Sequence, residues 1–331
     1  MVRDPQRGAR LSGSIGPARP LLFALVLVAL VVGCGVIAHS GGTATRPSGS
    51  AAQPEAAPVA DSAKLSPEAY QRRLGAANTS LTAAWRSVAS AGPYDAVGTA
   101  AADAGSAASR SADQLAELAP PAGADALNGE LVAGLRQVAT DLSGLTDQVS
   151  ASTLCASPAV VSGLSTAPGT TRLRDVAARL RGAGFQWGDF LGRPIPASDT
   201  RLANGAVVNA HRRGGLGELT VDNGNELDAV VTLAQAGAPA VSMYVRHGAK
   251  ATLNRIPDGS YQVFFTVGAD WNGEDRLFTR SCGFSKFDDL ASYATTQDGG
   301  RTRYVTYDVT LQPVFGGTAV IRQVGAANYP R

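Results

Sequence analysis

The sequence predicts an α+β multidomain protein: an N-terminal membrane anchor and a flexible tether, then an α-helical bundle, then an antiparallel β-sandwich. Three observations support this prediction. An apolar run of 18 residues at 21–38 contains no charge and no proline, and apolar residues recur every three or four positions across 65–184. From about residue 214 the apolar period falls to two. A chain of 331 residues is long enough for two modest domains plus linkers.

Residues 21–38 are the expected anchor. A helix of this length spans roughly 27 Å, close to the thickness of a bilayer hydrocarbon core. Residues 1–20 carry four arginines and one acid, so the positive-inside rule keeps this basic segment in the cytoplasm. The expected location is therefore the cell membrane, with residues after about 39 extracytoplasmic.

A lipoprotein signal is the second interpretation of the same run. Residues 31–34, Val-Val-Gly-Cys, resemble a lipobox, in which the chain is cleaved before Cys34 and this cysteine is lipidated. Against cleavage, the apolar run continues past Cys34 and the segment before the run is long. Cys34 can also be a small apolar residue inside a retained helix. The retained helix is preferred, and both forms attach the chain to the membrane.

Residues 39–63 are expected to be a flexible tether, because Gly, Ser, Ala, Pro and Thr offer too little apolar surface to offset the entropy of ordering. Residues 64–184 are expected to form an antiparallel bundle of three long helices and one or two short ones. Ser66 and Pro67 provide a helix N-cap and a proline at the first helical position. Apolar stripes at helical spacing cover 70–88, 97–118, 127–149 and 172–181.

Residues 185–213 are expected to be a packed connector, because Trp187, Phe190 and Leu191 make them too apolar for a free linker. The β-sandwich is expected over 214–325, with a short tail at 326–331. Regularly spaced turn signals separate eight or nine short strands. The expected strands are 217–222, 227–233, 240–245, 250–256, 261–267, 275–282, 286–295, 301–314 and 318–324.

Two resemblances accompany this layout. Residues 256–263, Ile-Pro-Asp-Gly-Ser-Tyr-Gln-Val, resemble the turn and strand of transthyretin-like (prealbumin-like) sandwich modules. The chain has 26 arginines against three lysines and is rich in alanine and glycine, which resembles a high-GC actinobacterial composition. The whole layout is similar to that of uncharacterised actinobacterial membrane-anchored envelope proteins, some of them lipoprotein-like. The resemblances imply a fold and an envelope location, and no activity.

Motifs for catalysis are missing from the sequence. His39, His211 and His247 do not have the spacing of metal ligands. The nearest match to a serine-nucleophile elbow, 163–167, fails at its last position and falls between expected helices. The glycines of 213–217 precede a strand, whereas a phosphate cradle needs a helix. We therefore expect no catalytic residue, metal or cofactor, and a net charge of +2 predicts no nucleic-acid partner.

Two acidic loops are candidates for binding. Residues 222–228 concentrate oxygen ligands, but their spacing is not that of a calcium loop, and Asn-Gly at 223–224 favours a hairpin turn. Residues 270–275 place Trp271 in a polar loop, where Asp270, Trp271 and Asn272 are candidates for a surface site that binds a sugar or a protein. The preferred alternative is that Trp271 folds back over the edge of the sandwich.

Cys155 and Cys282 are expected to form a disulfide. Exported domains usually pair their cysteines, and the anchor already accounts for Cys34. The bridge would join the region after the third helix to the sandwich. The alternative is two buried, unpaired thiols.

The main functional interpretation is a membrane-anchored extracytoplasmic binding or scaffolding protein of the cell envelope without catalytic activity. Its expected partners are the membrane and an unknown envelope protein or carbohydrate. One alternative is a wall-polymer hydrolase or transferase with its site at the interdomain seam, which requires carboxylates clustered in a cleft. Another is an extracytoplasmic carbohydrate or solute receptor, which requires a groove lined by aromatic side chains. The candidates for that groove are Trp271, Tyr293, Tyr304 and Tyr307.

Overall fold

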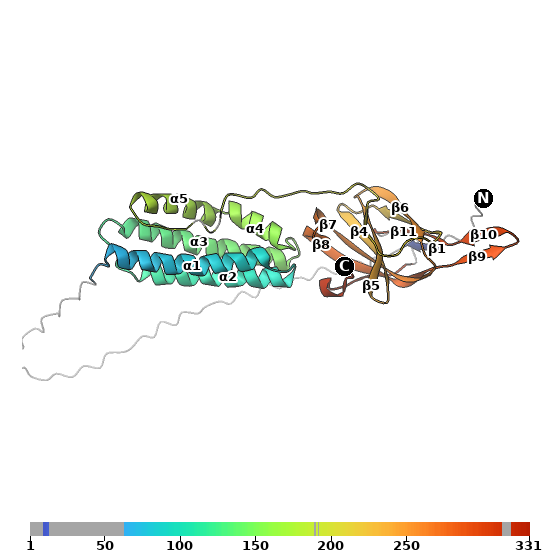
Figure 1. Ribbon diagram of the computed structural model, residues 1–331, viewed down its shortest axis with the longest axis horizontal. Coiled ribbons are helices and arrows are strands. Elements are labelled where there is room, and N and C mark those ends of the chain that lie inside the picture. Colours follow the sequence, from blue (N-terminus) through green and yellow to red (C-terminus); the bar gives the residue numbers. More distant parts are fainter. Residues whose placement is uncertain (1–8, 13–62, 189, 191, 313–318) are drawn as a thin grey trace, which may run out of the picture. The chain divides into compact units, whose positions relative to one another are not determined.

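The computed structural model describes residues 9–12, 63–188, 190, 192–312 and 319–331 (Figure 1). The expected anchor at 21–38, including the lipidation candidate Cys34, lies outside the described residues, as does the expected tether apart from its last residue. Within the described part of the chain, no helix is both long and apolar enough to cross a membrane.

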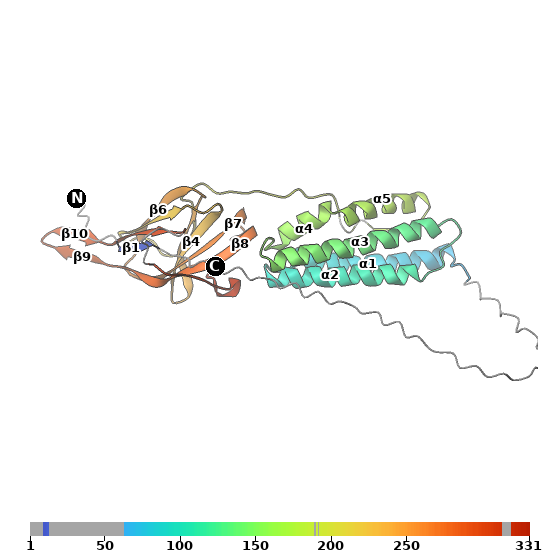
Figure 2. The ribbon, with the colours of Figure 1, turned by 180° about the vertical axis from the view of Figure 1, so that it is seen from behind.

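Five helices occupy the region expected to be helical. Their bounds are α1 (Pro67–Ser90), α2 (Asp95–Ala116), α3 (Asp125–Ser150), α4 (Ser157–Thr166) and α5 (Pro168–Gly182). Helices α1, α2 and α3 run alongside one another in both views (Figures 1 and 2), and residues from all five helices share one hydrophobic core. The placement of residues 163–167 between helices is wrong, because α4 covers most of them. Its ten residues include Gly163 and several serines, and they carry no long apolar stripe.

Local sequence accounts for the start of α1 and for the close contact between α5 and α3. The Ser66 hydroxyl accepts a hydrogen bond from the amide of Ala69 at 3.2 Å, and Pro67 occupies the first helical position, where no N–H is needed. Gly169 lies in the first turn of α5. A Cβ at this position would lie 2.5 Å from the amide nitrogen of Val138 in α3, so only glycine fits.

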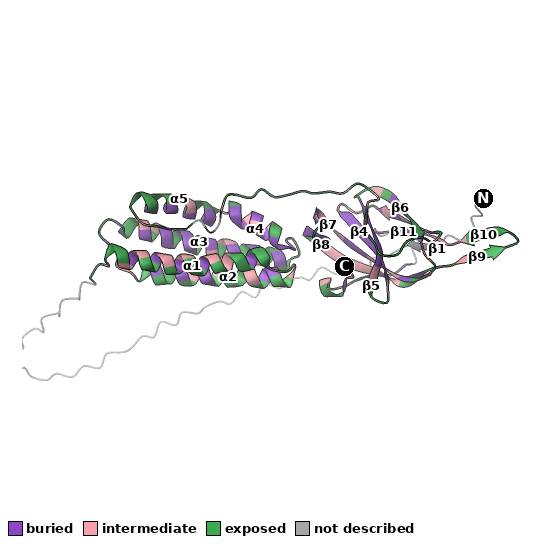
Figure 3. Cartoon of the chain, viewed as in Figure 1, coloured by how far each residue is buried: buried purple, intermediate pink, exposed green. Residues whose placement is uncertain are grey.

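A buried polar pair joins three helices. Tyr70 of α1 is fully buried, and its hydroxyl donates to Asn128 Oδ1 of α3 at 3.1 Å. The Asn128 amide in turn donates to the carbonyl of Leu115 in α2 at 2.9 Å. Burial raises the pKa of Tyr70 to about 12. Figure 3 shows the wider pattern, with buried residues on the inward sides of the helices and exposed residues on the opposite sides.

The strands form two larger sheets and a two-stranded ribbon. The six-stranded sheet has the order β12-β8-β7-β4-β5-β2, and its neighbouring strands are all antiparallel. The four-stranded sheet has the order β1-β11-β3-β6, and β9 pairs with β10. Residues from both larger sheets contribute to one core, as in a β-sandwich. The bounds are β1 (Ala9–Ser12), β2 (Val207–Ala210), β3 (Gly217–Asn223), β4 (Asp228–Gln235), β5 (Ala238–Val245), β6 (Ala249–Ile256), β7 (Gly259–Asn272), β8 (Leu277–Tyr293), β9 (Thr295–Asp298), β10 (Arg301–Tyr304), β11 (Thr306–Thr310) and β12 (Ile321–Gln323).

Strand β11 departs from the expected antiparallel pattern. It pairs parallel with β3 on one side and parallel with β1 on the other. Parallel neighbours require a long crossover connection. The chain from β4 to β10 supplies that connection between β3 and β11. The four-stranded sheet is therefore mixed, and the region as a whole is mostly antiparallel.

Strands β7 and β8 are longer than the sequence suggested, at 14 and 17 residues. Their pairing shifts register between Gln262 and Phe264 and again between Val267 and Ala269. Such bulges let a long strand bend and twist without ending it. As a result, the expected loop at 270–275 is partly the end of β7, and Cys282 lies within β8.

The connector packs at both of its ends. Trp187 is 5% exposed and belongs to the helical core, and Phe190 packs against the same core. At the other end, β2 adds to the edge of β5. The expected tail includes a short 3-10 helix, Ala326–Asn328, and the buried side chain of Tyr329. Leu191 lies outside the described residues.

Candidate functional site

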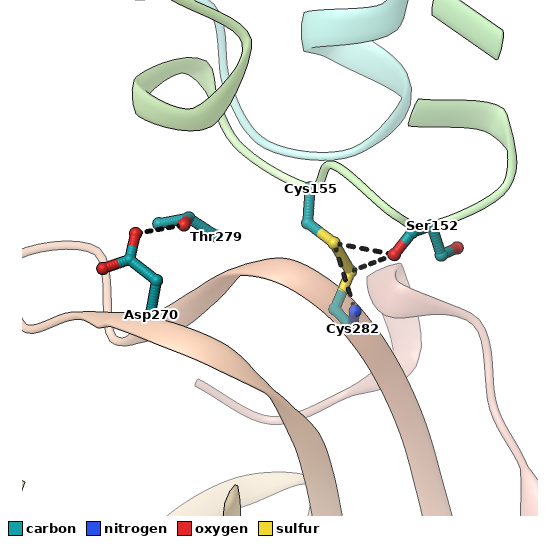
Figure 4. The surroundings of a disulfide bond; sticks show 5 residues. All are labelled: Ser152, Cys155, Asp270, Thr279 and Cys282. Carbon is teal, nitrogen blue, oxygen red and sulfur yellow. Dashed lines mark hydrogen bonds between the residues drawn. A yellow bond between two sulfur atoms is a disulfide. The ribbon is translucent and has the colours of Figure 1, made fainter. Parts of the chain in front are cut away.

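Cys155 and Cys282 form the expected disulfide (Figure 4). Their Cα atoms are 6.4 Å apart, within the usual range for a disulfide, and 127 positions separate them in the sequence. Both residues are buried. The bridge therefore joins the segment between α3 and α4 to the middle of β8.

Backbone hydrogen bonds support this bridge on both sides. The amide of Cys155 donates to the carbonyl of Thr279 at 2.8 Å. The amide of Ser281 donates to Thr153 at 2.9 Å, and that of Cys282 donates to Ser152 at 3.1 Å. The segment after α3 thus pairs with β8 like a very short added strand. These hydrogen bonds hold the two cysteines together independently of the sulfur–sulfur bond.

Asp228, at the start of β4, is a buried carboxylate with four donors around it. It is 5% exposed, and it accepts from Arg201 Nε at 2.7 Å and from Arg201 Nη2 at 2.5 Å. The Tyr244 hydroxyl and the amide of His247 also donate to it. Burial acts to raise the pKa of Asp228, but the hydrogen bonds from Arg201 and Tyr244 outweigh burial and hold that pKa at about 2. Asp228 is therefore ionised, and its carboxylate accepts hydrogen bonds from all four donors.

Asp270, near the end of β7, is a second buried carboxylate, also 5% exposed. Its donors are the Ser198 hydroxyl at 2.8 Å, the amide of Thr200 at 3.0 Å and the hydroxyl of Thr279, toward which it points in Figure 4. Burial again acts to raise the pKa of Asp270, and the hydrogen bonds from Thr279 and Thr200 lower it overall. Trp271 completes the contact by donating its amide to the carbonyl of Thr200 at 2.8 Å.

The two carboxylates hold the connector against the sandwich. Ser198, Thr200 and Arg201 belong to the connector, and each forms a hydrogen bond with one of these acids. The sequence analysis did not find this arrangement. The available signal was Asp228 itself, an acid that opens a strand whose next three residues are Ala, Val and Val. An acid at the edge of so apolar a run needs a buried partner.

The surface-binding interpretation of Trp271 is wrong. Its side chain is 4% exposed, and its ring lies edge-on to Tyr244 and Phe278, with centroids 6.0 and 5.1 Å away. The ring is buried because β7 runs on to Asn272 and carries the tryptophan into a small cluster with Val230. The alternative, that the ring folds back over the sandwich, is confirmed.

Asn272 and its neighbours form a tight turn. The Asn272 side-chain oxygen accepts from the amide of Glu274 at 2.9 Å and from that of Asp275 at 3.2 Å. This is an Asx-type turn, in which a side chain replaces a backbone acceptor. Asp270, Trp271 and Asn272 therefore have structural contacts of their own and do not form an open binding surface.

The four aromatic side chains proposed for a receptor groove do not line one common groove, although two of them are in contact. Trp271 belongs to the cluster with Tyr244, whereas Tyr293 is buried in the main sandwich core. Tyr307 contacts Tyr293, with ring centroids 5.2 Å apart. Tyr304 lies on β10, in the two-stranded ribbon.

The oxygen-rich loop at 222–228 is a turn between sheets. Asn223 ends β3 in the four-stranded sheet, whereas Asp228 begins β4 in the six-stranded one, so the expected hairpin at 223–224 is wrong. The Asn223 side chain is buried and donates to the carbonyls of Leu227 and Val245 at 3.0 and 3.1 Å. Among the described residues, no group of three His, Cys, Asp or Glu side chains is placed to hold a metal ion.

A hollow of about 1030 Å³ lies beside Cys282. The rings of Tyr94 and Phe284 line it, with Arg331 stacked 5.0 Å from the centre of the Tyr94 ring. Its described lining contains one carboxylate side chain, that of Asp95. The pair of carboxylates that a glycosidase requires is not found among these lining residues.

Comparison of the chain with models of protein families, with curated proteins and with solved structures found no match.

Proposed function

We propose that this chain is a membrane-anchored extracytoplasmic protein of the cell envelope that binds or scaffolds a partner without catalysis. The observation that carries the proposal is the Cys155–Cys282 disulfide. Disulfides persist in oxidising compartments outside the cytoplasm and are rare within it. The bridge therefore supports an exported location for the helical region and the sandwich.

The N-terminal sequence supports the same location. The apolar run at 21–38 follows a segment rich in arginine, and residues 39–63 have the composition of a flexible spacer. In this proposal the spacer lets the folded part reach a partner at some distance from the membrane. Retention of the helix is preferred over lipidation at Cys34.

The proposal of a binding role without catalysis is supported by the hydrogen bonds of the two buried acids. Asp228 and Asp270 are buried acids of the type that often serve catalysis. Donors from the connector and from the sandwich strands form hydrogen bonds with both of them. Both acids are better explained as groups that hold the connector in place. A disulfide-joined pair of folded regions is suited to presenting a binding surface.

Protease treatment of intact cells that express the full chain tests the location. A tag at each terminus reports which end is accessible, and non-reducing peptide mapping reports the disulfide. We expect loss of the C-terminal tag, protection of the N-terminal tag and a linked Cys155–Cys282 peptide. Intact mass of the membrane-bound form separates the two anchors, because a mature N-terminus at Cys34 with acyl chains means lipidation. Recovery in the cytosol with two free thiols would overturn the proposal.

Incubation with isolated cell-wall polymer tests the absence of catalysis. The full chain in detergent is mixed with the insoluble polymer, which is then sedimented. We expect no release of soluble fragments above a heat-inactivated control. Release in proportion to the amount of protein would instead favour the wall-polymer hydrolase.

A further inference from the structure

The outer edge of β11 has an unusual occupant. Strand β11 lies between β3 and β1, and β1 is the outermost strand of the four-stranded sheet. The pairing is parallel and covers four positions, from Ala9 opposite Tyr307 to Ser12 opposite Thr310. Without β1, therefore, β11 would be an open sheet edge.

In the proposed membrane-attached forms, β1 cannot pair with β11. Residues 9–12 precede the apolar run at 21–38, whereas β11 follows it. If 21–38 span the membrane, residues 9–12 and β11 lie on opposite sides of it. If the chain is cleaved before Cys34, residues 9–12 are lost. In both forms the edge of β11 is left without the strand that fits it.

We propose that the outer edge of β11 receives an extended segment of another envelope protein, added as a parallel strand. This inference rests on the proposed function, because the membrane separates the chain's own β1 from the edge. Strand addition is a general mode of peptide recognition, in which backbone hydrogen bonds provide affinity and alternate side chains provide specificity.

The backbone of β11 offers donors to such a segment. The amide of Leu311 points to β3, where it donates to the carbonyl of Asp222 at 3.0 Å. Successive amides of a strand point to opposite sides, so the amides of Asp308 and Thr310 point to the outer edge. Unpaired edge groups of this kind are the usual template for strand addition.

The side chains of β11 define what the segment should carry. Val309 is 2% exposed and faces the core, while Asp308 is exposed on the opposite face. The register places Thr306 opposite Glu218 and Thr310 opposite Asp222, so two further acids share the face of Asp308. Lys250 pairs with Asp222 at 3.1 Å. Because three acids share this face and Lys250 pairs with only one of them, the face favours a basic residue opposite Asp308.

The chain's own N-terminal segment has the pattern that this edge selects. The register sets Arg10 opposite Asp308 and Leu11 opposite Val309. A basic residue thus lies opposite an acid, and an apolar residue lies opposite a buried apolar one. The partner segment is expected to have the same alternation of a basic residue and an apolar one.

A charge-exchange experiment tests the proposal on the full chain in lipid nanodiscs. The probe is a labelled peptide with the sequence of residues 7–14, Arg-Gly-Ala-Arg-Leu-Ser-Gly-Ser, and its matched control has Glu in place of the central Arg. Hydrogen exchange at the outward-pointing amides of Asp308 and Thr310 locates the binding, because the amides between them face β3. We expect rapid exchange without the peptide and slowed exchange with it. Asp308→Lys should weaken binding of the basic peptide by about two- to fivefold and favour the acidic one.

Asp289→Lys is the matched control variant, because Asp289 is an exposed acid on β8, away from this edge. It should leave binding of both peptides unchanged. Exchange at β11 that stays rapid with either peptide would overturn the inference. Exchange that is slow before any peptide is added would also overturn it, because the edge is then already occupied. The protease experiment on intact cells measures the membrane location independently of peptide binding. A failure of the proposed function can therefore be distinguished from a failure of strand addition at β11.

Discussion

Arg201→Met tests whether the ion pair with Asp228 holds the connector on the sandwich. Methionine keeps much of the apolar stem and removes both donors to Asp228. Leaving a buried charge unpaired costs about 3–5 kcal/mol. Here the Arg201 side chain is 35% exposed, so water replaces part of the lost interaction, and Tyr244 and His247 still donate. We therefore expect a loss of about 2 kcal/mol in the free energy of unfolding at pH 7.

This loss should depend on pH in a defined direction. The pKa of Asp228 is about 2 in the folded chain, below the usual value of 3.8. A carboxyl with a lowered folded pKa stabilises the fold above its unfolded pKa and loses this effect as the pH falls through the folded value. Without Arg201 the folded pKa moves back toward the usual value. The difference between the variant and the wild type should therefore be full above about pH 4 and should shrink toward pH 2.

Urea unfolding of the full chain in detergent at pH 7 and near pH 2.5 measures the effect. Hydrogen exchange at β4 and β5 assigns it to the sandwich, where 2 kcal/mol corresponds to about thirtyfold faster opening. Arg213→Met is the matched control, because Arg213 is exposed and donates to the carbonyl of Asn254 rather than to an acid. Equal losses in both variants, or a loss in Arg201→Met that is identical at both pH values, would refute the reasoning.

Three further predictions concern stability. Replacing Cys155 and Cys282 by serine should cost up to about 4–5 kcal/mol by the loop-closure entropy of 127 positions, measured as a lower urea midpoint that reduction of the wild type reproduces. Trp271→Ala should cost about 3–5 kcal/mol, because the ring is buried, whereas an unchanged melting temperature would mean that the ring is exposed. Asn128→Leu should cost about 1–3 kcal/mol by leaving Tyr70 unpaired, and adding Tyr70→Phe should recover part of this loss in thermal unfolding.

The sequence predicted the helices well where local signals were strong. The stripe from Tyr70 to Val88 and the cap at Ser66 correspond closely to α1. A second short helix was allowed for, but the position of α4 was not predicted, because ten residues with Gly163 and several serines carry no periodic signal. The predicted strand boundaries were wrong for a different reason. Bulges allow β7 and β8 to continue through positions that resemble turns.

The contacts of the candidate site could be predicted only in part. The disulfide was predicted from the small number of cysteines and from an expected export. The pairing of Arg201 with Asp228 depends on the folded connector, and no local pattern reveals a partner 27 positions away. The turn at 223–224 shows a related limit, because an Asn-Gly turn has the same local chemistry whether it joins paired strands or two different sheets.

The disulfide also determines how the chain would respond to tension. In the proposed membrane-attached form with a partner held at β11, a force between the two would enter at the N-terminal side of α1 and leave through the sandwich. The bond between Cys155 and Cys282 carries that force directly, so α4, α5, the connector and the strands up to β8 are bypassed. Because 127 positions separate the cysteines, roughly 430 Å of extended chain is prevented from unravelling. In an oxidising environment the loop between the two cysteines would not lengthen under load, and reduction would release it as an extensible segment.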